Sequence, residues 1–196
     1  MKLYLINVGN FKLDGGAMFG VVPKSIWNKT NPADKNNMID IASRCLLIED
    51  GNRLILIDTG MGTKQSERFF NYYCRWGTDS LDVALATHGF CREDVTDVFL
   101  THLHFDHCGG CVQWNSDKTA YEIAFKNATF WSNEDHWKWA TNPNKRERAS
   151  FLTEDERNFL ENERKQQEET AKMRNDDYQL SYALDVLKGL ATLSQN

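Results

Sequence analysis

Long hydrophobic runs are missing from this chain of 196 residues. Since no apolar stretch approaches the roughly 20 residues that cross a bilayer, we expect no transmembrane helix and no membrane partner. The N-terminus, Met1 to Asn7, has too short an apolar stretch for a signal peptide and lacks a small-residue cleavage site. We therefore interpret it as the first strand of a cytoplasmic protein.

An excess of positive charge is also missing. The chain has 23 Lys and Arg residues against 28 Asp and Glu residues, which gives a formal net charge of −5. Because phosphate binding needs clustered Lys and Arg, this balance argues against a nucleic-acid partner. Hydrophobic residues make up 41% of the chain, enough for one domain with a single sizeable core.

The cysteines do not form a disulfide framework. Their number is odd and their spacing irregular: Cys45, Cys74, Cys91, Cys108 and Cys111. Reduced thiols are the simpler interpretation. Cys108 and Cys111 have no second pair, as a zinc knuckle would need, so we interpret them as small buried residues.

Apolar patterns predict an α/β domain. The clearest feature is a hairpin, in which Cys45–Glu49 and Arg53–Ile57 flank the turn Asp50-Gly51-Asn52. Further strands are expected at 2–8, 95–100, 120–125 and 128–131, and helices at 65–76, 81–88 and 133–140. Residues 14–20 suggest a glycine-rich turn that runs into a short extended piece, and residues 24–40 a surface loop.

The character of the sequence changes near Thr153. Thr153-Glu154-Asp155-Glu156 is a capping box that predicts a helix start. Residues 161–177 are almost wholly polar, and an apolar stripe at helical spacing follows, formed by Leu180, Ala183, Leu184 and Leu187. We expect a domain at 1–152 and an atypical helical tail at 153–196, whose stripe docks on the body or pairs with another chain.

Three histidines and an aspartate crowd into six residues, His102-Leu103-His104-Phe105-Asp106-His107. Extended residues at positions i and i+2 point to the same side, so His102 and His104 can reach one cation. The double glycine that follows lets the backbone bend and aim Asp106 and His107 at a second cation. Imidazoles with a carboxylate suit zinc, and other transition metals also fit.

Such a site makes hydrolysis accessible at neutral pH. A bound metal lowers the pKa of its water from about 15.7 to about 7, which generates a hydroxide nucleophile. Two metals roughly 3.5–4 Å apart can share that hydroxide and polarise the attacked carbonyl. Asp106 could bind the second metal and later pass a proton to the leaving group, which makes it the catalytic candidate.

The motif resembles the signature of the metallo-β-lactamase superfamily, in which it follows a strand ending in Leu-Thr. Leu54 to Gly60, with Asp58 at the strand end, is similar to a second motif of that family. The segments 14–24 and 142–152 resemble its quorum-quenching lactonase branch, and the likeness covers about residues 1–152. It implies the N-terminal half of an αβ/βα sandwich, with a mixed β-sheet and helices on one face.

The resemblance also implies residue roles. His102 and His104 would bind one zinc ion, and Asp106 and His107 the other, while Asp58 would orient the site through hydrogen bonds. The implied substrates are lactones such as N-acyl homoserine lactones. The segment 15–24, which contains Met18 and Phe19, would border the substrate pocket.

The family pattern stops near Leu152. The second half of the family normally brings a third histidine for the first metal, a bridging aspartate and a final histidine. After His107 the only histidine in this chain is His136, which we interpret as structural. We expect either a truncated or frameshifted reading frame or a domain rearrangement, together with weakened metal binding. A homodimer could supply the missing covering sheet.

Three functions therefore stay open. The first is a metal-dependent lactone hydrolase. The second is an inactive remnant that binds metal weakly or acts as an interaction module. The third is another superfamily activity, either a thioester hydrolase of the glyoxalase II type or a nuclease. The acidic charge argues against the nuclease, and the lactonase-like N-terminal segment favours the first function over the thioester hydrolase.

Overall fold

The computed structural model describes residues 1–151, 162, 165 and 168. The chain divides into two units, Met1–Leu152 and Thr153–Asn196. The helix start expected at Thr153 and the apolar stripe at 180–187 lie outside the described residues. The assignment of a domain and a tail therefore stays a prediction.

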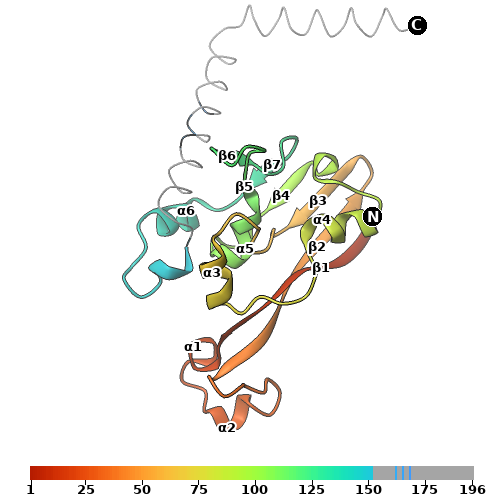
Figure 1. The fold of residues 1–196 in the computed structure, drawn as a ribbon. Helices are drawn as coiled ribbons and strands as arrows, with labels where there is room; N and C mark the ends of the chain where they lie inside the picture. Colours follow the sequence, from red (N-terminus) through yellow and green to blue (C-terminus); the bar gives the residue numbers. More distant parts are fainter. Residues whose placement is uncertain (152–161, 163–164, 166–167, 169–196) are drawn as a thin grey trace, which may run out of the picture. The chain divides into compact units, whose positions relative to one another are not determined.

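A mixed sheet of five strands forms the centre of the first unit (Figure 1). Its strands, in sheet order, are β1 (Lys2–Asp14), β2 (Met38–Asp50), β3 (Arg53–Ile57), β4 (Asp97–Phe99) and β7 (Thr129–Trp131). β1, β2 and β3 pair antiparallel, whereas β3, β4 and β7 pair parallel. A separate antiparallel pair is formed by β5 (Val112–Trp114) and β6 (Tyr121–Ile123). The expected α/β class is confirmed.

Short helices connect these strands. They are α1 (Gly15–Phe19), α2 (Lys24–Trp27), α3 (Glu67–Tyr72), α4 (Leu81–Thr87), α5 (Phe105–Cys108) and α6 (Glu134–Thr141), with 3-10 turns η1 (Arg92–Asp94), η2 (Gly109–Cys111) and η3 (Arg148–Ser150). Side chains of Ser66, Ser80 and Asn133 accept hydrogen bonds from the first turns of α3, α4 and α6. Such caps satisfy backbone N–H groups that have no partner within the helix, which explains where these helices begin.

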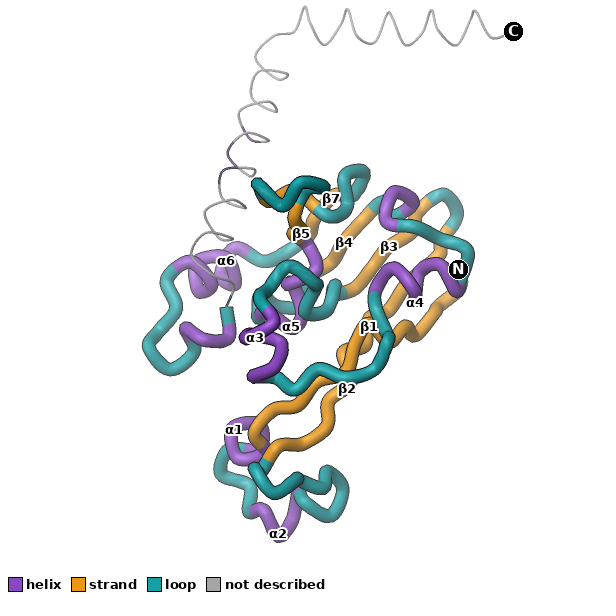
Figure 2. Tube along the Cα trace, in the orientation of Figure 1, coloured by secondary structure: helices purple, strands orange, loops and turns teal. Residues whose placement is uncertain are grey.

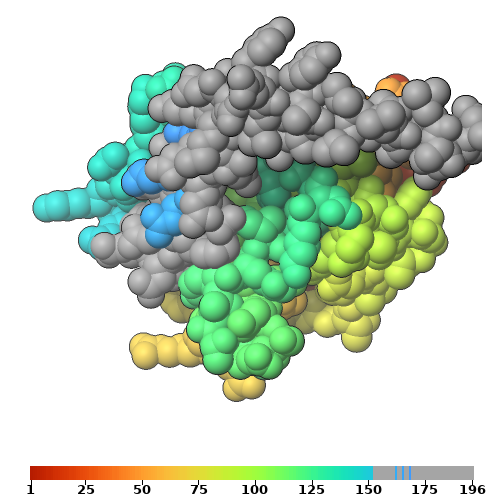
Figure 3. Space-filling view, turned by 90° about the horizontal axis from the view of Figure 1, so that it is seen from above, coloured from red at the N-terminus to blue at the C-terminus, as the bar shows by residue number. Residues whose placement is uncertain are grey.

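The two faces of the sheet differ in burial. Leu47, Leu56 and Val98 are fully buried on the inner face. Helix α4 lies on that side, since the ring of His88, at the end of α4, packs 4.5 Å from the ring of Tyr4 on β1. In Figure 3 the segment around α4 and η1 lies beside the segment of β5 and β6, and Arg92 donates a hydrogen bond to Gln113 between them.

The opposite face carries an apolar row, called here the outer row. Register places Leu5, Leu46, Ile57, Phe99 and Trp131 side by side across all five strands. Leu5 is 72% exposed, Phe99 48% and Trp131 49%. The mixed sheet with helices on one face, expected from the sequence, is therefore present, and its other face is open within the described residues.

Two sequence expectations were wrong. Residues 15–19 form the helix α1 instead of an extended piece, because the Asp14 carboxylate accepts a hydrogen bond from the backbone N–H of Ala17 and so caps a helical turn. Residues 24–40 are not one loop, since they contain α2 and the beginning of β2. β1 and β2 continue beyond the sheet as a ribbon that carries α1 and α2 at its far end (Figure 2).

Candidate metal centre

The histidine cluster lies where the chain leaves β4 and turns into α5. Leu103, Phe105 and Cys108 are buried and anchor this turn in the core. The polar residues that alternate with these buried ones, namely His102, His104 and Asp106, face away from the core, as the i, i+2 spacing predicts. The ring of His102 lies 4.6 Å from that of His104 and 4.0 Å from that of His107, measured between centroids. Three imidazoles are thus brought together by local geometry.

The glycines after the motif allow a close backbone contact. A Cβ on Gly109 would lie 2.4 Å from the carbonyl oxygen of Met61, and one on Gly110 the same distance from that of Thr59. The backbone N–H of Thr59 donates to the carbonyl of His107 at 2.7 Å. Because no side chain intervenes, the turn is fastened directly to the segment that follows β3.

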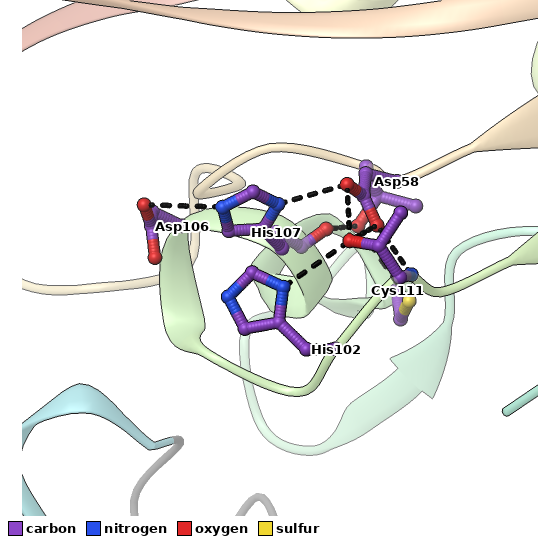
Figure 4. A network of polar contacts seen from close by, with 7 residues as sticks. Asp58, His102, Asp106, His107 and Cys111 are labelled. Atoms are coloured by element: carbon purple, nitrogen blue, oxygen red, sulfur yellow. Dashed lines mark hydrogen bonds and ion pairs between the residues drawn. The ribbon is translucent and has the colours of Figure 1, made fainter. Parts of the chain in front are cut away.

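Asp58 connects that segment to the cluster (Figure 4). Its carboxylate accepts hydrogen bonds from the backbone N–H and hydroxyl of Thr101, and Nδ1 of His107 lies 2.8 Å from its Oδ2. With Nδ1–H donating to Asp58, Nε2 of His107 keeps its lone pair on the side of Asp106, whose Oδ2 lies 3.6 Å away. A histidine oriented by a carboxylate in this way is typical of metal ligands.

The contact between Asp58 and His107 shifts the pKa of both side chains. Burial alone would raise the pKa of Asp58, but hydrogen bonds from His107 and Thr101 outweigh it and lower the pKa. Burial alone would lower the pKa of His107, but the hydrogen bond to Asp58 outweighs it and raises the pKa. The hydrogen bond between Asp58 and His107 therefore shifts the pKa values of the two groups in opposite directions.

His104 has a different environment. Its Nε2 is buried and has no hydrogen-bond partner among the described residues. Its ring packs 5.0 Å from Phe151 and 6.0 Å from Trp139, so aromatic side chains keep water away. Burial lowers the pKa of His104, and also that of His102, since an imidazolium is poorly solvated there. Neutral imidazoles are the form that binds metals.

The donor atoms of the histidine cluster suit a divalent metal, but their arrangement does not close around one. Imidazoles and a carboxylate are donors that zinc prefers, and the unpartnered Nε2 of His104 and the oriented Nε2 of His107 agree with such a role. Within the part of the chain that the structure describes, however, no three His, Cys, Asp or Glu side chains are arranged around one point that could hold a metal ion. The donor set fits a cation, but its present geometry is not that of a closed site.

The two residues expected to border the substrate pocket lie apart from the histidine cluster. Met18 and Phe19 are in α1, at the far end of the β1–β2 ribbon and well separated from α5 in Figure 1. Phe19 stacks on Trp27 with ring centroids 5.0 Å apart, and Met18 is exposed. Their role at a substrate pocket stays a prediction.

Sequence reasoning missed two residues that support the cluster. Lys64 is buried and donates a hydrogen bond to the carbonyl of Gly109, and burial lowers its pKa to about 8. Thr101 donates to Asp58 through both its backbone and its hydroxyl. Only the Leu-Thr that precedes the motif signalled Thr101, and nothing in the sequence signalled Lys64.

The comparisons with known proteins agree with this architecture. The chain is 27% identical over 147 residues to the N-acyl homoserine lactonase AiiB of Agrobacterium fabrum, which covers 69% of this chain and 52% of AiiB. An N-acyl homoserine lactonase of Bacillus cereus is 29% identical over 119 residues, covering 56% of this chain and 43% of that protein. The chain spans about half the length of these relatives.

Solved structures give the same picture. A "probable metal-dependent hydrolase" from Staphylococcus aureus superposes with a TM-score of 0.71 at 31% identity, covering 79% of this chain and 54% of that one. AidC, a dizinc quorum-quenching lactonase in complex with a product, superposes with a TM-score of 0.55 at 27% identity. The superposition covers 72% of this chain and 45% of AidC. Residues 39–182 match the family described as the metallo-beta-lactamase superfamily. With this match over most of its length and the histidine turn at the end of β4, the chain belongs to the metallo-beta-lactamase superfamily.

Proposed function

We propose that this chain carries the metal-binding part of a hydrolase that opens cyclic esters such as N-acyl homoserine lactones. The observation on which this proposal rests is the histidine cluster beside Asp58. The Asp58 carboxylate orients His107, and His104 has a buried nitrogen without a partner among the described residues. Membership of the superfamily implies the use of a divalent metal. The names of AiiB and AidC support a lactone as the substrate class.

The proposal assigns each donor a role. His102 and His104 would hold one cation and Asp106 and His107 the other, with zinc as the first candidate. When bound, such cations supply Lewis-acid activation of water and of an ester carbonyl. Asp58 holds the His107 ring in the orientation that leaves Nε2 free to bind.

The chain's own residues supply the remaining chemistry. Oδ2 of Asp106, 3.6 Å from Nε2 of His107, is the atom we assign to carry a proton to the leaving oxygen when the lactone ring opens. Trp139 and Phe151 exclude water from one side of His104. This strengthens electrostatic interactions at the cluster because the local dielectric constant falls.

Other functions remain as alternatives. A remnant that binds metal weakly is favoured by one observation, since no three candidate donors converge among the described residues. A thioester hydrolase of the glyoxalase II type would use the same donors. A homodimer, which the sequence allows, and a cytoplasmic location, which it predicts, also stay proposals. No helix among the described residues is long and apolar enough to span a membrane.

Metal analysis combined with turnover tests the proposal. We expect the purified chain to bind about two equivalents of zinc and to hydrolyse N-hexanoyl homoserine lactone, and His104→Ala to abolish turnover. His88→Ala, at the end of α4, is the control and should retain both properties. Sub-stoichiometric metal without turnover would support the remnant, and hydrolysis of an acyl thioester but not of the lactone would support the thioester hydrolase.

A further inference from the structure

The hydroxyl of Thr101 lies between the carboxylate of Asp58 and the ring of His102. Its Oγ1 is 2.8 Å from Oδ2 and 3.0 Å from Oδ1 of Asp58, and 3.2 Å from Nδ1 of His102. Nδ1 of His107 lies 2.8 Å from the same Oδ2 of Asp58. A continuous chain of polar contacts therefore runs from one imidazole to the other through Thr101 and Asp58 (Figure 4).

The directions of these hydrogen bonds follow from the donors available. An ionised carboxylate only accepts hydrogen bonds, and a hydroxyl has a single hydrogen to donate. The Thr101 hydroxyl therefore donates to Asp58, which is also its nearer neighbour. Its oxygen can then only accept from the ring of His102, so the hydrogen of that neutral ring lies on Nδ1 and the lone pair on Nε2.

The same carboxylate thus acts on two rings. In a neutral imidazole either nitrogen can carry the hydrogen, and the hydrogen bonds of the ring decide which one does. For His107 the partner is Asp58 itself, and for His102 it is the Thr101 hydroxyl. The two ring centroids are 4.0 Å apart, and Figure 4 shows one nitrogen of each ring on the side of Asp58 and the other turned away from it. Both Nε2 atoms are left with lone pairs on that other side.

We propose that Thr101 is a positioning residue whose hydroxyl transmits the orienting effect of Asp58 to His102. The backbone N–H of Thr101 also donates to Asp58, at 2.9 Å, so the hydroxyl is held in place at two points. The assignment concerns only residues of this chain and can be tested without a metal. Its purpose rests on the proposed function, since neutral imidazoles with a free lone pair are the form that binds cations.

Nitrogen-15 spectra of the full chain, treated with a chelator, test the assignment directly. At a pH of about 8, above the usual imidazole pKa of about 6.5, each neutral ring shows one protonated and one bare nitrogen with separate signals. We expect His102 to carry its hydrogen on Nδ1 in the unmodified chain and in Thr101→Ser. In Thr101→Val the hydrogen should move toward Nε2, the position that free histidine favours in water.

Thr96→Val is the matched control for these spectra. Its hydroxyl also donates to a carboxylate, that of Asp97 at 2.8 Å, but it lies at the other end of β4. The signals of His102 should be unchanged in this variant. A hydrogen on Nε2 of His102 in the unmodified chain would overturn the proposal whatever the stability of the variants, and so would a hydrogen that stays on Nδ1 in Thr101→Val.

Zinc titration separates this inference from the proposed function. Isothermal titration of Zn²⁺ should show affinity weakened about tenfold in Thr101→Val and nearly restored in Thr101→Ser. Thr96→Val should bind like the unmodified chain. Unchanged affinity in Thr101→Val, in a chain that binds zinc, would overturn the positioning role. Absence of zinc binding by the unmodified chain would instead overturn the proposed function, while the tautomer of His102 would still stand or fall by the spectra.

Discussion

At the scale of single residues, Asp58 combines an unusual backbone conformation with contacts to the histidine cluster. It lies directly after β3 with a φ of 61°, in the left-handed region that Asp and Asn tolerate better than most residues. Its buried carboxylate accepts hydrogen bonds from Thr101 and holds Nδ1 of His107. One side chain therefore sets both the path of the chain and the orientation of a candidate ligand.

Asp58→Asn separates these two functions, because Asn accepts the same backbone conformation but lacks the charge. We expect the free energy of unfolding to fall by about 2–3 kcal/mol, since hydrogen bonds to a charged group are lost. Zinc affinity should fall about 10- to 100-fold. Urea unfolding and zinc titration measure the two effects. Asp117→Asn, at an exposed position, is the control, and equal behaviour of the two variants would contradict the role of Asp58.

At the scale of elements, the turn from α5 into η2 depends on small residues. Gly109 and Gly110 let it approach the backbone of residues 59–61 directly, and this contact carries the hydrogen bond from Thr59 to His107. The position of the histidines is thus set by packing of backbone on backbone.

Gly110→Ala should disturb this contact. Its Cβ would lie 2.4 Å from the carbonyl oxygen of Thr59, so the turn must shift, at a cost of about 1–3 kcal/mol. Zinc affinity should fall with stability. Gly51→Ala, in the β2–β3 turn, meets no atom within 4 Å and costs only about 1–2 kcal/mol of backbone strain at its positive φ. Its zinc affinity should be unchanged, and a loss equal to that of Gly110→Ala would refute the explanation.

Local signals explain which elements were predicted. Strand β3 has the predicted bounds because Asp50-Gly51-Asn52 forces a tight turn between two apolar runs. Helix α1 was missed because adjacent glycines suggest a turn, while the ring of Trp27, which packs on Gly15, is a tertiary contact. The histidine cluster shows the same difference between local signals, which the sequence displays, and tertiary contacts, which it does not. The grouping of His102 and His104 follows from their spacing, whereas the buried Lys64 depends on packing that the sequence does not display.

At the scale of the whole molecule, the outer row is the main exposed apolar feature of the described sheet. Sheets stack face to face through such rows in known folds. The ion pair between Arg53 and Asp97 on the same face is neutral as a unit, and Trp131 also donates to Asp97. Two copies that met through this face would bury the outer row, which is compatible with the homodimer that the sequence allows.

Sedimentation velocity at rising protein concentration measures this association. We expect the unmodified chain to form dimers, and Leu5→Lys combined with Phe99→Lys to keep it monomeric, since a charge on the outer row would have to be desolvated. Val21→Lys is the control, because Val21 is 101% exposed but lies between α1 and α2. A monomer at every concentration in the unmodified chain would argue against the homodimer.

Two hydrogen-bonded contacts that hold the histidine turn cross the parallel junction between β3 and β4. Asp58 and its partner Thr101 are 43 positions apart in the sequence, and Thr59 and its partner His107 are 48 positions apart. Loops of this length close slowly, because chain entropy is lost before any contact compensates for it. The hairpin of β2 and β3 can form early and alone, but the cluster exists only once distant segments have joined. Under the proposed function, capture of a cation would therefore come late in folding and would report its completion.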